Sequence, residues 1–395
     1  MLKSIFNTNS INISKHWCLF MLLIIFSHYV FGIIINVPQD YNTIQGAINA
    51  VIDGTDERNE IIVSPQAQPY VESILIEGLT RSLTLRSTFD PDLGNFDAIS
   101  NTILKAPSAH YNNSTGDLEF YPVVSIINCR GFDEENETPT NNRIIVQGFT
   151  ITGGTGYQTI SDTQNTTYIS QGGGVYIFAD DNESHAYQKV EVKHCEIYDN
   201  KACHGGGLYS GGSDIILSDS RIHNNELFYY GDLPICSHDN SYDGPKGGGV
   251  FLDGGFNMMN NVQVLKNKSY IDSGSNLYGL PYSQQLHTNG NYGAMYYRTF
   301  CHDSSANLLN CSFFENVTQV DPALVERCQW NVQANLFFQR GRANQDSLLF
   351  KSCTATRNRN ITTTNLPHTA LGIDRYIYDE NNYNCTYYSN HIINC

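Results

Sequence analysis

The sequence predicts an all-β protein in which one chain winds into a parallel β-helix, a solenoid of short stacked strands, with an N-terminal helix capping the first coil. Three observations favour this fold class. A strand-like unit ending in Asn recurs along the chain, three glycine runs each lead into an apolar–aromatic pair, and the segment before the repeats has apolar residues at helical spacing. We expect one solenoid domain, residues 33–395, of roughly ten coils.

The N-terminal segment 40–54, DYNTIQGAINAVIDG, predicts the capping helix. Thr43 is suited to the N-cap and Gly54 to the end of the helix. The apolar residues at helical spacing are Ile44, Ala47, Ile48 and Val51. Because the first coil of a solenoid exposes its apolar interior, an amphipathic helix is expected to cover it.

The recurring unit reads HCEIYDN (194–200), DSRIHNN (219–225), NVQVLKN (261–267), NCSFFEN (310–316), SCTATRN (352–358) and NCTYYSN (384–390). Asn tolerates the left-handed backbone that a tight corner needs, and stacked amide side chains can bond to one another along the axis. We therefore expect a structural ladder of stacked asparagines: Asn200, Asn225, Asn267, Asn316, Asn358 and Asn390.

Two further columns precede this ladder, and their period of two indicates strands with one buried face. The positions three before each Asn hold Ile197, Ile222, Val264, Phe313, Ala355 and Tyr387. The positions five before hold Cys195, Ser220, Val262, Cys311, Cys353 and Cys385. The earlier segment QGFTITGG (147–154) fits the same frame, with Gly154 in the Asn column.

The glycine runs occur in QGGGVYI (171–177), CHGGGLYSGG (203–212) and KGGGVFLDGG (246–255). Glycine lets the chain turn without Cβ clashes before the next short strand rejoins the stack. A phosphate-binding loop is not favoured, because no helix follows any of the three runs.

These motifs resemble known families. INVPQDYNTIQGAINAVIDG, IIVSP, PYVESILIEG and SLTLRS are similar to the opening coils of pectin-lyase-like right-handed parallel β-helix proteins. The C-x-[I/F]-x-x-N and GGG-[V/L]-[Y/F] units resemble the repeats of chlamydial polymorphic outer membrane proteins. The resemblance covers about residues 35–395 and implies a right-handed parallel β-helix. It is specific for fold and weak for function, because the shared residues are core and corner residues.

Residues 1–32 predict a secretory signal peptide, with Lys3 and Lys15 before the apolar run WCLFMLLIIF (17–26) and cleavage near Gly32. Retention of this segment as a signal anchor is the alternative. The mature chain is expected to have no membrane span and to be secreted, extracellular or on the cell surface. Candidate glycosylation sites are Asn112, Asn113, Asn136, Asn165, Asn182, Asn267, Asn310, Asn316, Asn360 and Asn384.

The formal net charge is −16 and the pI about 5.0, which excludes nucleic acid and anionic membrane as favoured partners. Ten cysteines remain after the signal, and an oxidising compartment favours disulfides among them. Cys311, Cys353 and Cys385 share one column and lie within disulfide reach of a neighbouring coil. The spacing of Cys and His does not predict a metal site.

Outward-facing positions of the recurring strand supply ligand-binding candidates. Register places Glu196 beside Arg221 and Tyr198 beside His223 on neighbouring coils. One interpretation is a solvated ladder with a weak ion pair. The other is a sugar-binding strip, in which aromatic rings stack on pyranose faces and the charged pair orients hydroxyl groups.

Asp180, Asp181 and His204 are weak catalytic candidates. They resemble the paired Asp and the GHG motif that polygalacturonases place on neighbouring coils. The chain departs from that family by having HGGG in place of GHG, no NTD and no RIK-like segment. Paired carboxylates in FADDNESHAY (178–187) could also bind calcium, although Asn182 begins a sequon there.

The sequence thus predicts a secreted or cell-surface β-helix protein that is non-catalytic and binds glycans or other extracellular proteins. The alternative is a polysaccharide lyase or glycoside hydrolase that acts on an extracellular polysaccharide. No cofactor is expected, with calcium as the exception for a lyase. A cluster of carboxylates beside Arg, Lys or His would favour the enzyme, whereas a flat polar face bearing Tyr would favour binding.

Overall fold

The computed structural model describes most of the chain. The described residues are 32–54, 58–111, 118–129, 132–133, 138–139, 142–160, 168–179, 188–227, 246–271, 291–298, 304–320, 333–340, 347–361, 369–375 and 391–393. The predicted signal peptide therefore lies outside them except for Gly32, as do Asp180, Asp181, Cys385 and Asn390.

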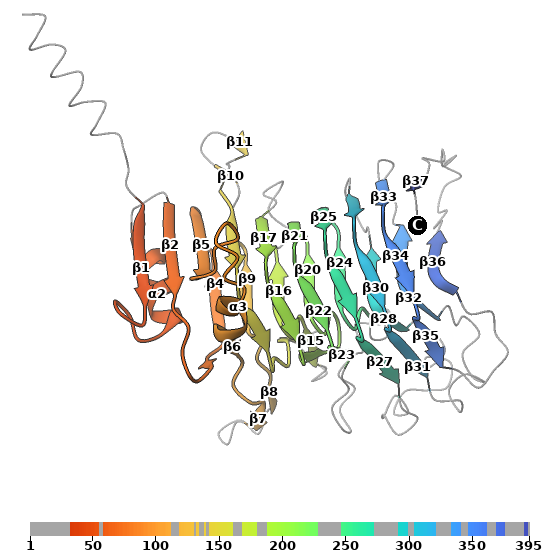
Figure 1. The fold of residues 1–395 in the computed structure, drawn as a ribbon, viewed down its shortest axis with the longest axis horizontal. Coiled ribbons are helices and arrows are strands. Elements are labelled where there is room, and N and C mark those ends of the chain that lie inside the picture. Colours follow the sequence, from red (N-terminus) through yellow and green to blue (C-terminus); the bar gives the residue numbers. More distant parts are fainter. Residues whose placement is uncertain are drawn as a thin grey trace, which may run out of the picture.

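Three long sheets, parallel throughout, run the length of the molecule, accompanied by one shorter sheet (Figure 1). Sheet I contains β1 (Ile33–Val37), β2 (Arg58–Val63), β5 (Ser82–Ser87), β12 (Ile144–Gln147), β17 (Lys189–Lys193), β21 (Asp214–Ser218), β25 (Phe256–Asn260), β29 (Ser305–Leu309), β33 (Ser347–Lys351) and β37 (His391–Ile393). Sheet II contains β3 (Tyr70–Val71), β6 (Ile103–Lys105), β13 (Thr150–Thr152), β18 (Glu196–Tyr198), β22 (Arg221–His223), β26 (Gln263–Leu265), β30 (Ser312–Phe314) and β34 (Thr354–Thr356).

Sheet III contains β4 (Ile74–Glu77), β9 (Val124–Ile127), β16 (Val175–Phe178), β20 (Leu208–Gly211), β24 (Val250–Asp253), β28 (Asn291–Arg298), β32 (Gln333–Arg340) and β36 (Thr369–Arg375). The shorter sheet IV contains β19 (Lys201–Ala202), β23 (Glu226–Leu227), β27 (Lys268–Ile271), β31 (Val317–Val320) and β35 (Arg359–Ile361). One coil passes from sheet I to II, IV and III and then returns to I. The predicted right-handed parallel β-helix is confirmed, and ten described strands in sheet I agree with the expected number of coils.

Connection lengths differ sharply around the coil. From β12 onward, sheet I joins sheet II through two residues, for example 194–195 between β17 and β18. The same corner between β5 and β6 is longer and carries the short helix α3 (Asp97–Asn101). Long connections otherwise lead into or out of sheet III. Three described hairpins occur there: β7 (His110–Tyr111) with β8 (Leu118–Glu119), β10 (Phe132–Asp133) with β11 (Thr138–Pro139), and β14 (Tyr157–Ile160) with β15 (Tyr168–Gln171).

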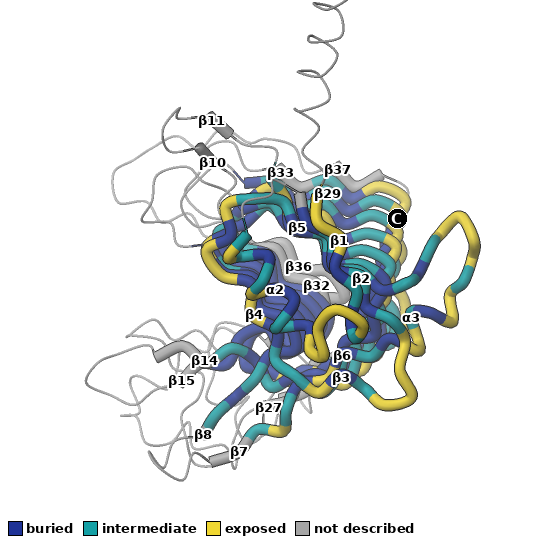
Figure 2. Tube along the Cα trace, turned by 90° about the vertical axis from the view of Figure 1, so that its left-hand side faces the viewer, coloured by how far each residue is buried: buried dark blue, intermediate teal, exposed yellow. Residues whose placement is uncertain are grey.

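Helix α2 (Ile44–Ile52) forms where apolar spacing predicts it. The Thr43 hydroxyl accepts a hydrogen bond from the Gly46 amide at 3.1 Å, which satisfies one of the free donors of the first turn. The helix contacts β1, β2 and β4 and lies across the N-terminal end of the apolar interior (Figure 2). Its buried residues are Ile44, Ala47, Ile48 and Val51.

The interior is a continuous apolar stack of the predicted columns. Phe149, Ile151, Cys195, Ile197, Ile222, Val262, Val264, Cys311, Phe313 and Cys353 are all buried. Ala355 differs from the prediction because it lies on β34, the last strand of sheet II, and is exposed. Aligned strands bury the same interior positions coil after coil, which is the main source of apolar stabilisation in this fold.

The predicted ladder exists, but its asparagines do not supply the left-handed corner conformation. That conformation belongs to the residue immediately before each one: Asp199, Asn224, Lys266, Glu315 and Arg357, with φ between 52° and 55°. A second set of left-handed residues closes the corner from sheet I to sheet II: His194, Asp219, Asn261, Asn310 and Ser352. The ladder asparagines act through their side chains instead.

Each ladder amide from Asn200 to Asn316 joins three coils. In Asn225 the Oδ1 atom accepts hydrogen bonds from the backbone and side-chain nitrogens of Asn200, both at 3.0 Å. Its Nδ2 atom donates to the Ile197 carbonyl and to Asn267 Oδ1, again at 3.0 Å. The pattern repeats through Asn316 to Asn358, and at the other end the Gly154 amide donates to Asn200 Oδ1 at 2.9 Å. The ladder therefore satisfies buried backbone groups that the corner leaves without sheet partners.

The glycine runs have two separate physical causes. Gly205, the first of its run, has φ of 61°, a left-handed conformation that favours glycine. Gly207, the third, has no such requirement. A Cβ there would lie 2.7 Å from the Gly249 carbonyl oxygen and 2.9 Å from Asn225 Nδ2, so the coil above leaves no room for a side chain. The turn explanation holds for the first glycine, and close coil packing explains the third.

Two sequon predictions are wrong. Asn267 and Asn316 are fully buried, and their Nδ2 atoms are engaged in the ladder, so the folded chain has no room for a glycan on either. Asn310 is exposed and stays a candidate site. Asn360 lies in β35, and the other candidates fall outside the described residues: Asn112, Asn113, Asn136, Asn165, Asn182 and Asn384.

The cysteine prediction also requires correction. Cys129, Cys195, Cys311 and Cys353 are free thiols in the apolar interior, while Cys203 is disulfide-bonded. Cys311 and Cys353 are neighbours in one column, as predicted, because each precedes residues that pair in β30 and β34. They pack as small apolar side chains, which is how free buried cysteine behaves in most cores.

We predict that Asn225→Ala lowers the free energy of unfolding by about 2–5 kcal/mol, because it leaves buried donors and acceptors of two coils unpaired. Denaturant unfolding followed by circular dichroism measures the change. The matched control is Asn260→Ala, half-buried on the outer face of sheet I, for which we expect a change within about 0.5 kcal/mol. Equal effects of the two substitutions would contradict the structural role of the ladder.

Candidate functional site

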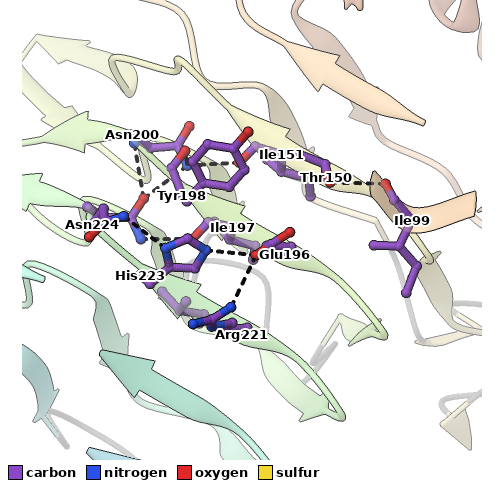
Figure 3. A network of polar contacts seen from close by, with 12 residues as sticks. Ile99, Thr150, Ile151, Glu196, Ile197, Tyr198, Asn200, Arg221, His223 and Asn224 are labelled. Atoms are coloured by element: carbon purple, nitrogen blue, oxygen red, sulfur yellow. Dashed lines mark hydrogen bonds and ion pairs between the residues drawn. The ribbon is translucent and has the colours of Figure 1, made fainter. Parts of the chain in front are cut away.

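The ligand-binding candidates lie together on the outer face of sheet II (Figure 3). Ile197 and Ile222 point into the core, so the residues on either side of each point outward. Strands β18 and β22 pair in parallel with Glu196 opposite Arg221 and Tyr198 opposite His223. The predicted cross-coil neighbours are therefore confirmed.

Glu196 is the centre of this cluster. Its Oε1 atom lies 3.0 Å from His223 Nε2 and 3.6 Å from Arg221 Nη1. On the other side of the imidazole, His223 Nδ1 lies 3.1 Å from Asn224 Nδ2. Because the Asn224 amide nitrogen can only donate, Nδ1 accepts, and the proton of the neutral ring is on Nε2, directed at Glu196.

The Tyr198 and His223 rings stack along the helix axis, with centroids 5.1 Å apart and planes at 16°. That stacking covers one face of the phenol, so only its other face is available to a pyranose. This second face lies toward Thr152 of the preceding coil, a side chain too small to cover an aromatic ring. The molecular surface therefore rises from the small Thr152 side chain to the ring of Tyr198, and this rise is called the step below. The predicted strip of several sugar-stacking faces is reduced to one.

The connection that carries α3 bounds the step on the side of Glu196. Thr150, the cross-coil neighbour of Glu196, is buried, and its hydroxyl donates to the Ile99 carbonyl at 3.0 Å. The same connection packs Phe89 against His194 with ring centroids 5.0 Å apart. Helix α3 thus packs against β13, the strand that precedes β18 in sheet II, and Ile99 lies on the Glu196 side of the cluster (Figure 3).

The charges of the cluster offset one another. Burial lowers the pKa of His223 below its usual value, although the hydrogen bond with Glu196 acts in the opposite direction and Arg221 reinforces the lowering. Burial also raises the pKa of Tyr198, with a smaller contribution from the Glu196 charge. At neutral pH the cluster therefore presents a neutral imidazole and a neutral phenol beside the side chains of Glu196 and Arg221.

The weak catalytic candidates are not brought into this cluster. Asp180 and Asp181 lie outside the described residues. His204 is 4% exposed on the other side of the coil, and its ring meets Phe251 edge-on with centroids 5.2 Å apart. Its burial argues against direct contact with a surface polysaccharide. In the described ranges no three His, Cys, Asp or Glu side chains gather as metal ligands.

An aromatic column on the outer face of sheet III was not predicted. Tyr176, Tyr209, Phe251 and Tyr296 follow one another on successive coils and are all buried, with ring centroids between 4.9 and 5.5 Å apart. Tyr176 and Tyr209 are stacked, whereas the other two pairs meet edge to face. Lys246, also buried, lies over the Tyr296 ring at 4.8 Å. The aromatic residue that follows each glycine run was the signal in the sequence, but its period alone does not say which face it occupies.

Comparisons with known proteins show likeness of fold alone. No protein-family model and no curated protein matches the chain. Among solved structures it is similar to a deglycosylated Aspergillus niger pectin methylesterase, at 11% identity and TM-score 0.36 over 86% of this chain and 89% of the other. A rice weevil pectin methyl esterase matches at 10% identity and TM-score 0.29 over 82% and 88%.

The A-module of Azotobacter vinelandii mannuronan C-5 epimerase AlgE4 is similar at 11% identity and TM-score 0.22, over 84% of this chain and 94% of that one. At such identities the likeness does not extend to function. The parallel β-helix itself is established by the strand pairing and not by these matches. The resemblance to chlamydial repeats stays a prediction.

We predict that the stability of the wild-type protein relative to His223→Gln falls as the pH drops below about 6.5. The folded-state pKa of His223 is lowered, so the unfolded chain takes up the proton first and the stabilising contribution, present above that pH, is lost. Denaturant unfolding of both proteins between pH 7.5 and about 5 measures the difference. His194 is shifted in the same direction and is present in both proteins, so it cancels. A relative gain of wild-type stability at low pH would mean that the Glu196 ion pair outweighs burial.

Proposed function

We propose that this protein is a secreted or cell-surface β-helix protein that binds extracellular glycans without cleaving them, through Tyr198, Glu196, Arg221 and His223. The observation that carries the proposal is one rigid surface on which an aromatic face lies beside a carboxylate and a guanidinium. Sugars present an apolar ring face and a rim of hydroxyl groups, and this combination is complementary to both.

The polar groups divide the recognition between them. The Glu196 carboxylate accepts hydrogen bonds from sugar hydroxyls, and Arg221, whose side chain is 50% exposed, donates to them. His223 is only 12% exposed, so its part is to hold Glu196 in place. Because these side chains project from paired strands, their orientation is fixed before a ligand arrives, which reduces the entropy lost on binding.

The setting supports an extracellular role. The predicted signal peptide, the exposed sequon at Asn310 and the disulfide at Cys203 agree with a secretory route. Within the described residues no helix has the length and apolar character needed to cross a membrane. The hydrolase or lyase alternative has Asp180, Asp181 and His204 as its candidate catalytic residues, and calcium is expected only for a lyase.

We predict that Tyr198→Ala and Glu196→Gln each weaken glycan binding about tenfold, because each removes one of the two complementary features. A glycan array of neutral and uronic polysaccharides identifies ligands, and calorimetry then gives the dissociation constants. The matched control is Phe314→Ala, in the same outward column three coils along, for which we expect unchanged affinity.

The same panel tests catalysis. We expect no release of reducing ends or unsaturated products, with or without calcium. Product release would overturn the non-catalytic proposal, and the Asp181→Asn variant would then test whether Asp181 is catalytic. Glycan binding that survives both substitutions in the cluster would place the binding surface elsewhere.

A further inference from the structure

A second surface, on the outer face of sheet I, has the features of a ligand site. A groove of about 280 Å³ runs across strands β17, β21, β25 and β29. Its apolar part is formed by Ile216, Met258 and Phe256. Its polar part includes four charged side chains, which come from Arg143 and from strands β17 and β21. This surface shares no residue with the cluster on sheet II.

The apolar part of the groove is open to solvent. Phe256 is 49% exposed and Ile216 is 40% exposed, although each lies in the middle of the solenoid. Strand register brings them together, because Ile216 pairs with Met258, two residues along β25 from Phe256. Covering an exposed aromatic ring and its apolar neighbours with a flat apolar partner removes this surface from water, which favours binding.

The charged groups compensate one another within the groove. Arg143 and Lys189 are the cations, and Glu191 and Asp214 are the anions. Arg143 Nη1 lies 3.7 Å from Glu191 Oε2, and Lys189 is the cross-coil neighbour of Asp214. Asp214 Oδ1 also accepts a hydrogen bond from the Phe256 amide at 2.9 Å, which ties the carboxylate to the strand that carries the ring.

We infer that this groove binds a neutral saccharide, with a sugar ring against Phe256 and its hydroxyls on Asp214, Glu191 and Lys189. Two cations and two anions give no net attraction for a charged ligand, and the chain as a whole, at −16, repels uronic acids. The paired charges nevertheless offer both donors and acceptors within reach of one ring. A neutral molecule with an apolar face and many hydroxyls matches both halves of the groove.

This inference rests on sheet I alone and holds whether or not the cluster on sheet II binds glycans. If both surfaces bind, one solenoid presents two sites on adjacent faces of the same coils. A branched or long polysaccharide that reaches both would then be held more tightly than by either site.

The test uses the full mature chain and hexasaccharides of cellulose, xylan and mannan, with oligogalacturonate as the charged comparison, in calorimetric titrations. We expect at least one neutral hexasaccharide to bind, Phe256→Ala to weaken it about tenfold, and Phe256→Tyr to retain it. Tyr41→Ala, an exposed aromatic at the N-terminal end, is the matched control and should leave the affinity unchanged. Circular dichroism of each variant verifies the fold.

Tyr198→Ala separates the two surfaces. Neutral-sugar binding that is lost in Phe256→Ala and kept in Tyr198→Ala supports the groove, even if the cluster on sheet II proves inert. Binding that depends on Tyr198 and not on Phe256 overturns the inference and leaves the proposed function intact. Tighter binding of oligogalacturonate at Phe256, or no binding by any neutral hexasaccharide, also overturns it.

Discussion

Stacking one coil on the next at the spacing of a β-sheet is the constraint on which the rest of this structure depends. Strands within a sheet pair their backbone amides and carbonyls with one another. The corner between sheet II and sheet IV is buried, and its backbone groups have no such strand partners. The asparagine ladder resolves this, since each amide from Asn200 to Asn316 accepts from the preceding coil and donates to the next. The same close stacking removes the side chain at Gly207, where the coil above would collide with a Cβ. Ladder and glycines are two consequences of one geometry.

Regular stacking also determines what the surface can do. Side chains separated by 25 or more residues become neighbours in straight columns, so a pair such as Glu196 and Arg221 is held at fixed separation by the backbone. A site of this kind needs no loop to close over it. The corner from sheet I to sheet II stays at two residues after β12, so no inserted segment at this corner covers either sheet there. The insertion that carries α3 is the exception, and it lies beside Glu196.

Much of the fold could be predicted from the sequence because the repeat unit contains its own register. The Asn column aligned Ile197 with Ile222 and Tyr198 with His223 without further information. The conformation of the corner could not be read in the same way, because Lys266, Glu315 and Arg357 adopt a left-handed backbone that their side chains do not signal. Nor could the groove on sheet I be predicted, since Ile216 and Phe256 belong to strands outside the aligned unit. The sequon at Asn267 shows the opposite error. The local motif predicts a glycan, but the side chain is buried and bonded in the ladder.

The most direct test of this account is backbone hydrogen exchange resolved to single residues in the native protein. The amides of Asn200, Asn225, Asn267 and Asn316 donate to a side-chain oxygen of the next coil, not to a sheet partner. The account predicts that they exchange as slowly as the amides of Ile197 and Ile222 in the core strands. Exchange as fast as that of exposed corner amides would contradict it, because the coils would then be joined by their sheets alone.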